Sequence, residues 1–374
     1  MSLRFVLALV LGVSVMGIAQ GSPRMNEVEL FRSGQGGYHT YRIPALVAAG
    51  KNTVLAFCEG RRNSAADSGD IDILLRRSLD GGLTWGKVQL VVPGGGNTSG
   101  NPCPIVDSSD GTVWLLFCKN LARGAESLIT EGRAPRTVWI TKSTDLGVTW
   151  AEPKEITNSV KEKSWTWYAT GPGHGIQLKS GRLVAACDHG RKSGAKRYGH
   201  SHVIYSDDHG KTWKIGGIVD NGTNESTVVE LSDGRLYINC RNTRQGVEVP
   251  AARIHAWSKD GGLSFSKTAR DGVLIEPICQ ASLIRVPGDR DVVLFSNPAS
   301  GKREKMTLRL SRDACATWPI SRVLYAGPSA YSDLAVADDG SICCMYERGR
   351  ANPYESITFA RFDLEWLTGG PKSR

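Results

Sequence analysis

Arginines that interrupt apolar, strand-like segments are the first residues in this sequence that could do chemistry. Arg42 stands in YRIP (Tyr41–Pro44), Arg241 stands in YINCRN, and GKREKMTLRLS carries Arg303 near its start and Arg309 near its end. A guanidinium binds a carboxylate through two parallel hydrogen bonds and keeps its charge at physiological pH. These arginines are therefore candidates for a clamp on an anionic ligand. The alternative is that each forms an ordinary ion pair.

Carboxylates that could transfer protons gather between two strand-like runs, in CEGRRNSAADSGDIDILLRRS. Its four candidates are Glu59, Asp67, Asp70 and Asp72. Asp67 lies in a Ser/Ala/Gly-rich stretch, where a mobile loop could close its carboxylate on a substrate. Asp70 and Asp72 open the following strand and are interpreted as structural. Asp67 is therefore the candidate for acid–base work.

A repeated eight-residue pattern, Ser-x-Asp-x-Gly-x-Thr-Trp, shows what must position these side chains. Each copy has turn chemistry, because Asp can accept hydrogen bonds from its own turn and Gly permits positive φ. An apolar or alternating strand precedes each copy. Five copies on successive repeats cannot share one site, so their aspartates are interpreted as structural. Those residues are Asp80, Asp145, Asp208, Asp260 and Asp313, the last in a copy with Cys315 in the Gly position.

The spacing of this repeat predicts the architecture. Successive copies lie about 52 to 65 residues apart, which suits one four-stranded blade each. Residues 27–370 then hold six blades, and the sequence predicts an all-β, six-bladed β-propeller as one domain. Helical periodicity competes only near residues 121–131. A two-sheet sandwich is the alternative, but it would not repeat one turn so regularly.

Composition narrows the possible partners. The formal net charge of +9 favours anionic partners, but Lys and Arg are scattered and no nucleic-acid motif occurs.

Residues 1–21 combine one basic residue, an apolar stretch and small residues, which is typical of a secretory signal peptide. Because no later segment is long and apolar enough to span a bilayer, we expect a secreted or periplasmic protein without a membrane anchor. The nine cysteines contain no CxxC pair, so we expect no zinc site and mostly buried thiols, with some disulfides possible.

The repeated box and YRIP, in order with the segments around Asp67, Glu225 and Tyr331, resemble the sialidases (neuraminidases) of the bacterial and animal type. The resemblance covers essentially the whole chain after residue 21. It implies hydrolysis of terminal sialic acid from glycans, with no metal or organic cofactor. Sialic acid carries a carboxylate on its anomeric carbon, which suits an arginine clamp. The partners implied are sialylated glycoproteins, glycolipids and oligosaccharides.

The resemblance also implies a role for each matching residue. Three arginines bind the carboxylate: Arg42, Arg241 and, ahead of the fifth box, Arg303, with Arg309 as the alternative. Arg61 contacts the substrate's flank, with Arg62 as the fallback, and Asp67 is the acid/base. In NESTVVELSDG, Glu225 is the base and Glu230 is structural. Tyr331 in AYSDL is the nucleophile, Glu347 in MYERG orients the first arginine, and Trp167 and Tyr168 are either contact or packing residues.

A tyrosine nucleophile makes physical sense for such a substrate, and sialidases are a known exception among retaining glycosidases. An anionic nucleophile would approach the reacting carbon against the charge of the neighbouring carboxylate. A phenol starts neutral, and a neighbouring Glu225 can take its proton during attack. Tyr331 then attacks while Asp67 protonates the leaving oxygen, and Asp67 activates the water that releases the sugar with retention.

Three other readings remain open. A non-catalytic propeller with the same boxes would have no reason to keep all six of Arg42, Asp67, Glu225, Arg241, Arg303 and Tyr331 in order. A glycosidase acting on neutral polysaccharide would need two carboxylates but no arginine trio. A trans-sialidase or an intramolecular trans-sialidase would share every residue, because the acceptor depends on the shape of the cleft.

Overall fold

A computed structural model describes residues 25–193, 196–244, 250–288 and 291–369. Within these ranges the chain forms short antiparallel sheets and three short helices, α1 (Glu126–Thr130), α2 (Thr157–Val160) and α3 (Leu364–Thr368). No helix among the described residues is long and apolar enough to cross a membrane. The expected signal peptide, residues 1–21, lies outside the described residues.

The strands form four hydrogen-bonded sheets, two of which each contain two neighbouring blades, so they group into six blades of consecutive antiparallel strands. Blades 1 to 3 contain, in order, β2 (Thr40–Ala48), β3 (Val54–Arg61), β4 (Ile71–Ser78) and β5 (Gln89–Val92); β6 (Thr98–Val106), β7 (Val113–Asn120), β8 (Arg136–Ser143) and β9 (Lys154–Glu155); and β10 (Trp165–Thr170) with β11 (Ile176–Gln177), β12 (Leu183–Ser193), β13 (Lys196–Ser206) and β14 (Lys214–Ile218).

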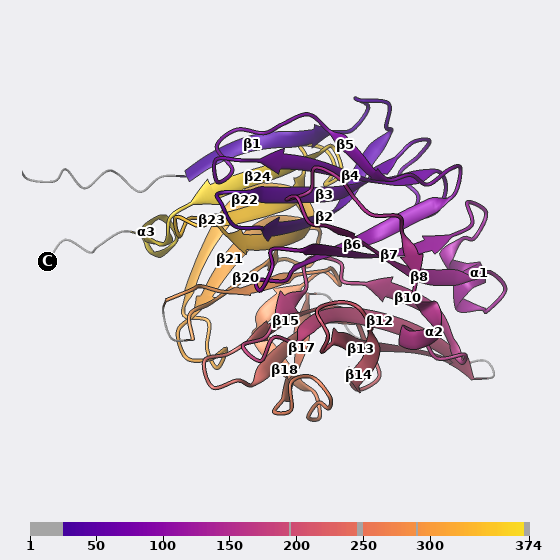
Figure 1. The fold of residues 1–374 in the computed structure, drawn as a ribbon. Coiled ribbons are helices and arrows are strands. Elements are labelled where there is room, and N and C mark those ends of the chain that lie inside the picture. The colour runs from indigo at the N-terminus through magenta and orange to yellow at the C-terminus, as the bar shows by residue number, and fades with distance from the viewer. Residues whose placement is uncertain (1–24, 194–195, 245–249, 289–290, 370–374) are drawn as a thin grey trace, which may run out of the picture.

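Blades 4 and 5 contain β15 (Thr223–Glu230), β16 (Leu236–Asn242), β17 (Ala251–Ser258) and β18 (Ala269–Glu276); and β19 (Ser282–Arg285), β20 (Val293–Pro298), β21 (Glu304–Ser311) and the first part of β22 (Ile320–Val336). Blade 6 contains the second part of β22, then β23 (Ile342–Arg348), β24 (Ser356–Phe362) and β1 (Met25–Arg32). The first described strand therefore completes the last blade, and Figure 1 shows β1 beside β24.

The six blades surround a common axis, which confirms the predicted six-bladed β-propeller. Contacts between neighbouring blades run from β2 to β6, β6 to β10 and β11, β12 to β15, β15 to β19, β19 to β22, and β22 back to β2. Six buried apolar clusters fill the spaces between the blades, and each combines side chains from two neighbours. Burial between blades explains why the strands are apolar on both faces, as in Val54–Arg61.

The five repeated turns connect the third and fourth strands of blades 1 to 5. In the first, Asp80 accepts hydrogen bonds from Ser78 Oγ (2.7 Å), Thr84 N (2.8 Å) and Thr84 Oγ1 (2.5 Å). The other four copies repeat these contacts. Blade 6 lacks such a turn because its fourth strand is β1, which explains five copies on six blades.

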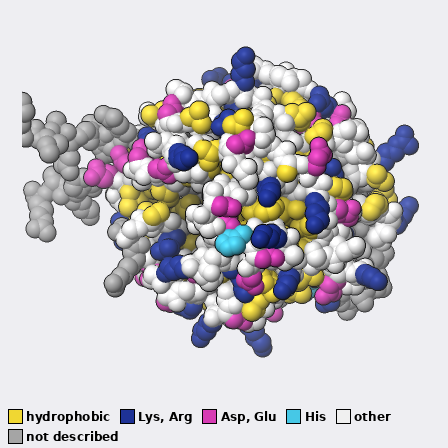
Figure 2. Space-filling view, viewed as in Figure 1, with side chains coloured by type: hydrophobic (Ala, Val, Ile, Leu, Met, Phe, Trp, Pro, Cys, Tyr) yellow, Lys and Arg dark blue, Asp and Glu magenta, His cyan; other side chains and the backbone are white. Residues whose placement is uncertain are grey.

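All nine cysteines lie within the described ranges, and each is a buried free thiol. The disulfides that the sequence left possible are therefore not formed in this structure. On the face shown in Figure 2, basic and acidic side chains are interspersed rather than segregated.

Candidate active site

A cavity of about 380 Å³ brings together residues that are far apart in the sequence. It collects side chains from all six blades and from the loop between β3 and β4. Seven of the eight residues to which the resemblance gives a role in the reaction or in binding line it: Arg42, Arg61, Asp67, Glu225, Arg241, Arg303 and Tyr331, and the candidates Glu59 and Trp167 line it as well. The eighth, Glu347, is fully buried and contacts Arg42 from behind.

Tyr331 and Glu225 form the closest pair in this cavity. The Tyr331 hydroxyl, on β22, donates a hydrogen bond to Oε1 of Glu225, on β15. Arg241 donates to the other oxygen of Glu225 at 2.8 Å and lies 3.4 Å from the Tyr331 hydroxyl. Burial first, and then Glu225, raise the pKa of Tyr331 well above its ordinary value, against the opposing charges of Arg241 and Arg303. The phenol is therefore neutral at rest and already bonded to a proton acceptor.

Three arginines face the same tyrosine. The guanidinium carbons of Arg42 and Arg303 lie 5.2 and 5.5 Å from the centre of the Tyr331 ring, and Arg241 reaches its hydroxyl. Arg42 Nε donates to Glu347 at 2.6 Å. Burial alone would lower the pKa of Arg42, but Glu347 raises it above its ordinary value. A carboxylate in this cavity would meet three permanent positive charges.

The two candidates for the third arginine differ in position. Arg303 precedes β21, lines the cavity, and donates to the hydroxyl of Tyr354 at 2.7 Å. Arg309 is buried within β21, where Nη1 donates to Asn297 at 3.3 Å, and it is not among the residues that line the cavity. The geometry agrees with the choice of Arg303.

Asp67 lies at the mouth of the cavity, in the loop of residues 62–70, and its side chain is 63% exposed. Its Oδ1 is 2.7 Å from Arg61 Nη1 and 4.0 Å from Arg42 Nη1. Partial burial would raise the pKa of Asp67, but Arg61 and then Arg42 hold it below its usual range. Asp67 is thus a carboxylate at rest, paired with arginine.

The other acidic residues near Asp67 have different contacts. Asp70 accepts from the backbone N–H of Gly96, and Asp72 accepts from that of Gly94. Both also pair with Arg62, whose Nη2 lies 2.6 Å from Asp72, and none of these three lines the cavity. These contacts fit the structural interpretation of Asp70 and Asp72. Arg62 lies outside the cavity lining, where it could not contact the flank of the substrate in place of Arg61.

Several residues that line the cavity were missed by sequence reasoning. Arg136 stacks on Trp167, with its guanidinium carbon 4.3 Å from the ring centre, and also donates to Asn101. Trp167 Nε1 donates to Asp188 at 3.0 Å, and Asn224 donates to the same oxygen at 2.9 Å. Burial first, and then Glu225, raise the pKa of Asp188 well above its ordinary value. Together these residues form a wall of the cavity beside Glu225.

One signal could have found part of this wall. Arg136 opens RTVWITKS, and so interrupts a strand-like segment as Arg42 and Arg241 do. Trp167 lines the cavity and contacts Arg136, whereas its neighbour Tyr168 is buried in the core and bonds to His202. Trp167 therefore faces the cavity, whereas Tyr168 is a packing residue.

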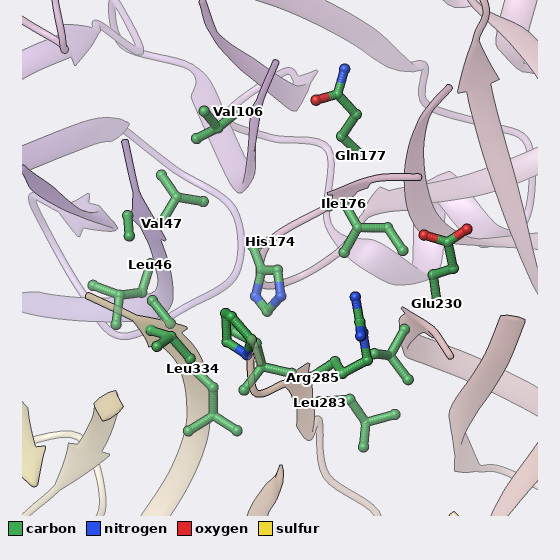
Figure 3. Close-up of a pocket in the computed structure, with 17 residues that line it drawn as sticks. Leu46, Val47, Val106, His174, Ile176, Gln177, Glu230, Leu283, Arg285 and Leu334 are labelled. Carbon is green, nitrogen blue, oxygen red and sulfur yellow. The ribbon is translucent and has the colours of Figure 1, made fainter. Parts of the chain in front are cut away.

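A second cavity, of about 290 Å³, contains none of the seven predicted residues. Figure 3 shows it lined mainly by aliphatic side chains, with His174, Gln177, Glu230 and Arg285 as polar members. Glu230 accepts a hydrogen bond from Lys179 N there, away from Glu225. Within the described ranges, no group of three or more His, Cys, Asp or Glu side chains could hold a metal ion.

Comparisons with known proteins find relatives over most of the chain. A family model described as a BNR repeat-like domain matches residues 52–344. The chain is 34% identical to a sialidase of Micromonospora viridifaciens over 93% of its length, and it spans 55% of that relative. It is 30% identical to an exo-alpha-sialidase of Aspergillus fumigatus, with 94% of this chain and 93% of the relative covered.

Solved structures show the same fold. The structure titled Hadza microbial sialidase Hz136 superimposes with a TM-score of 0.82 at 31% identity, covering 91% of this chain and 69% of that one. A sialidase of Trypanosoma rangeli, at 20% identity and a TM-score of 0.72, supports the fold alone; 91% of this chain and 60% of that one are covered.

Proposed function

The chain belongs to the sialidase family of glycoside hydrolases, and from that premise we propose that it is an exo-sialidase that removes terminal α-linked sialic acid with retention, through a tyrosyl intermediate. One observation carries the proposal: the hydrogen-bonded pair of Tyr331 and Glu225 lies among three arginines in one cavity. A neutral nucleophile with its own base suits a substrate that carries a carboxylate at the reacting carbon.

In the first step, Tyr331 Oη attacks the anomeric carbon and passes its proton to Glu225. The bond from that carbon to the leaving oxygen breaks, and Asp67 protonates the oxygen. Arg42, Arg241 and Arg303 hold the substrate carboxylate, and Glu347 keeps Arg42 in orientation. Because positive charge develops at the sugar ring, the clamp must bind tightly without shielding the carbon from attack.

In the second step, water attacks the anomeric carbon and gives its proton to Asp67. The bond to Tyr331 breaks, and the phenolate takes back its proton from Glu225. Asp67 must be protonated in the first step, although in the free protein it is paired with Arg61. Substrate that engages Arg61 would weaken this pair and raise the pKa of Asp67, so that the acid forms where it is needed.

The proposal also includes the partners of the protein and its location. The partners are sialylated glycoproteins, glycolipids and oligosaccharides, and residues 27–370 act as a single catalytic propeller. Residues 1–21 direct export, which gives a secreted or periplasmic enzyme. Sequencing the N-terminus of the protein recovered outside the cytoplasm tests the export step.

The test of activity is release of a fluorogenic phenol from a sialoside, with the sugar product identified by mass spectrometry. We expect free sialic acid with its initial configuration retained. An anhydro form of sialic acid as the product would instead indicate that the protein is an intramolecular trans-sialidase. A mechanism-based fluorinated sialoside should label Tyr331, and labelling of another residue would contradict the tyrosyl intermediate.

A further inference from the structure

The loop of residues 62–70, which carries Asp67, is attached near its end by the hydroxyl of Thr98 to Gly69 and by the backbone N–H of Gly96 to Asp70. Oγ1 of Thr98, the first residue of β6, donates to Gly69 O at 3.0 Å and accepts from Gly69 N at 3.1 Å. Thr98 is 2% exposed and pairs with Ile71 in a parallel bridge between blades 1 and 2. Both polar groups of the Gly69 backbone are thus bonded to one buried side chain.

Gly69 needs this attachment because of its backbone. Its φ of +142° lies in a region that side-chain-bearing residues rarely adopt, and an added Cβ would meet nothing within 4 Å. A side chain at this position would therefore be strained by the backbone conformation and not by a clash. Two hydrogen bonds from Thr98 hold this backbone, only two residues after Asp67.

The beginning of the loop is attached to the same strand by charged groups. Glu59 accepts two hydrogen bonds from Arg61, at 2.9 and 2.7 Å, and one from the backbone of Asn101 in β6, at 2.8 Å. Arg61 in turn donates to Ala65 O at 2.6 Å. The start of β6 therefore supports the loop on both sides of Asp67.

Asp67 itself has little else to fix its position. Its side chain is largely exposed, and it pairs with the two arginines that also face the substrate space. When a substrate binds to those arginines, only the attachments at the two ends of the loop determine where the Asp67 carboxyl group lies. Misplacing a catalytic group by about 1 Å can cost roughly 10²-fold in rate.

We propose that Thr98 is a positioning residue for the proton donor: its hydroxyl holds Gly69 so that Asp67 reaches the leaving oxygen. The role rests on the proposed exo-sialidase function. It acts through Asp67, so its loss should matter most when the leaving group is a sugar hydroxyl that needs protonation, and least when the leaving group is an activated phenol.

The test compares Thr98→Val, which keeps the shape but lacks the hydroxyl, with Thr98→Ser, which keeps the hydroxyl. We expect Thr98→Val to lower kcat/KM for a sialylated oligosaccharide by about 10–100-fold and for an activated aryl sialoside by no more than about threefold, since a good leaving group needs little proton donation. Thr98→Ser should restore both rates to within about threefold of wild type. Thr227→Val is the matched control, because Thr227 Oγ1 accepts a buried hydrogen bond from Leu283 N in another blade.

Gly69→Ala keeps the test decisive if Thr98→Val does not fold. It strains the same attachment at an open position, so it should produce the same dependence on the leaving group. If the wild type is active but Thr98→Val or Gly69→Ala loses equal activity on both substrates, Thr98 does not position Asp67. The same follows if Thr98→Ser is as slow as Thr98→Val. Either result leaves the proposed exo-sialidase function in place. A wild type that releases neither leaving group would remove the proposed function, and this role with it.

Discussion

The Tyr331 hydroxyl donates its hydrogen bond to Glu225 across 106 residues of sequence, from blade 6 to blade 4. The bond orients the phenol oxygen and provides the acceptor for its proton. Arg241 bonds to the same carboxylate, so Glu225 is held on both oxygens. The pair keeps a poor nucleophile neutral until a substrate carbon is within reach.

Removing the Tyr331 hydroxyl should stop turnover while leaving the fold intact. Tyr331→Phe loses the attacking oxygen and the proton donor to Glu225 but keeps the buried ring. We expect kcat on an aryl sialoside to fall by at least about 10³-fold, the scale on which loss of a nucleophile acts. Tyr354→Phe is the control, because Tyr354 also lines the cavity and its hydroxyl accepts a hydrogen bond from Arg303 but does not contact Glu225; it should keep most of kcat. Wild-type turnover by a folded Tyr331→Phe variant would exclude Tyr331 as nucleophile.

The three arginines should act together on one carboxylate. Replacing Arg42, Arg241 or Arg303 by Ala should weaken binding of an unsaturated sialic acid inhibitor by about 2–5 kcal/mol, measured by calorimetry. Lys should restore only part of this, because it lacks the planar fork. Glu347→Gln should cost less than Arg42→Ala, since it disturbs the orientation of Arg42 and not the contact itself. Inhibitor binding that is unchanged in one arginine variant would remove that arginine from the clamp.

Asp67 should show the dependence on the leaving group that an acid catalyst requires. We expect Asp67→Ala to slow cleavage of sialylated oligosaccharides by about 10²–10⁴-fold and to affect the first step on an activated aryl sialoside far less. Asp70→Ala is the matched control, because Asp70 bonds to Arg62 and Gly96 outside the cavity; it should act through stability. Pre-steady-state rates on both substrates make the measurement. Equal losses on both would exclude Asp67 from the acid role.

A buried histidine pair should make the fold sensitive to acid. His189 and His202 lie with ring nitrogens 3.1 Å apart; burial first, and then nearby histidines, lower the pKa of His189 to about 2 and of His202 to about 3. Below pH 6.5 the unfolded chain binds protons that the folded chain excludes, so the free energy of unfolding falls as the pH drops. Each histidine contributes up to about 1.4 kcal/mol per pH unit.

Urea unfolding between pH 7 and pH 4 (roughly the range in which the unfolded histidines gain their protons) measures this effect. In His202→Gln the free energy of unfolding should fall less steeply with decreasing pH than in wild type. The reason is that the variant has one fewer histidine that must stay unprotonated in the folded state. A decline of equal slope in both proteins would show that the acid sensitivity comes from other groups.

The repeated turns should affect stability without affecting chemistry. Asp145 accepts hydrogen bonds from Ser143 and Thr149, and these contacts lower its pKa to about 2. Asp145→Ala should lower Tm, measured by calorimetry, and leave the ratio of rates on sugar and aryl leaving groups unchanged. A changed ratio at unchanged Tm would contradict a purely structural role.

Residues inside local motifs could be predicted, and residues outside them could not. The repeated turns revealed the blade period because each turn builds its own hydrogen bonds, independent of the rest of the fold. Tyr331 and Glu225 could be assigned because AYSDL and NESTVVE match a family. The number of turns alone would have suggested five blades; the sixth has no turn because β1 comes from the other end of the sequence.

Asp188 shows why the rest was harder. It becomes part of the cavity only when blade 3 meets blades 2 and 4, and no neighbour in sequence signals this. The role of Thr98 is likewise invisible locally, since its partner Gly69 lies across a blade boundary. The fifth turn is an exception of another kind: Cys315 adopts a φ of +64° where the other copies have glycine.

The pairing of β1 with β24 has a consequence for synthesis. Met25 is synthesised long before its partner Phe362. While the first five blades are made, blade 6 consists of β1 alone, and the edge of β1 has no partner until β24 follows. A pause or truncation before β24 would leave the edges of β1 and β23 free to pair with other chains.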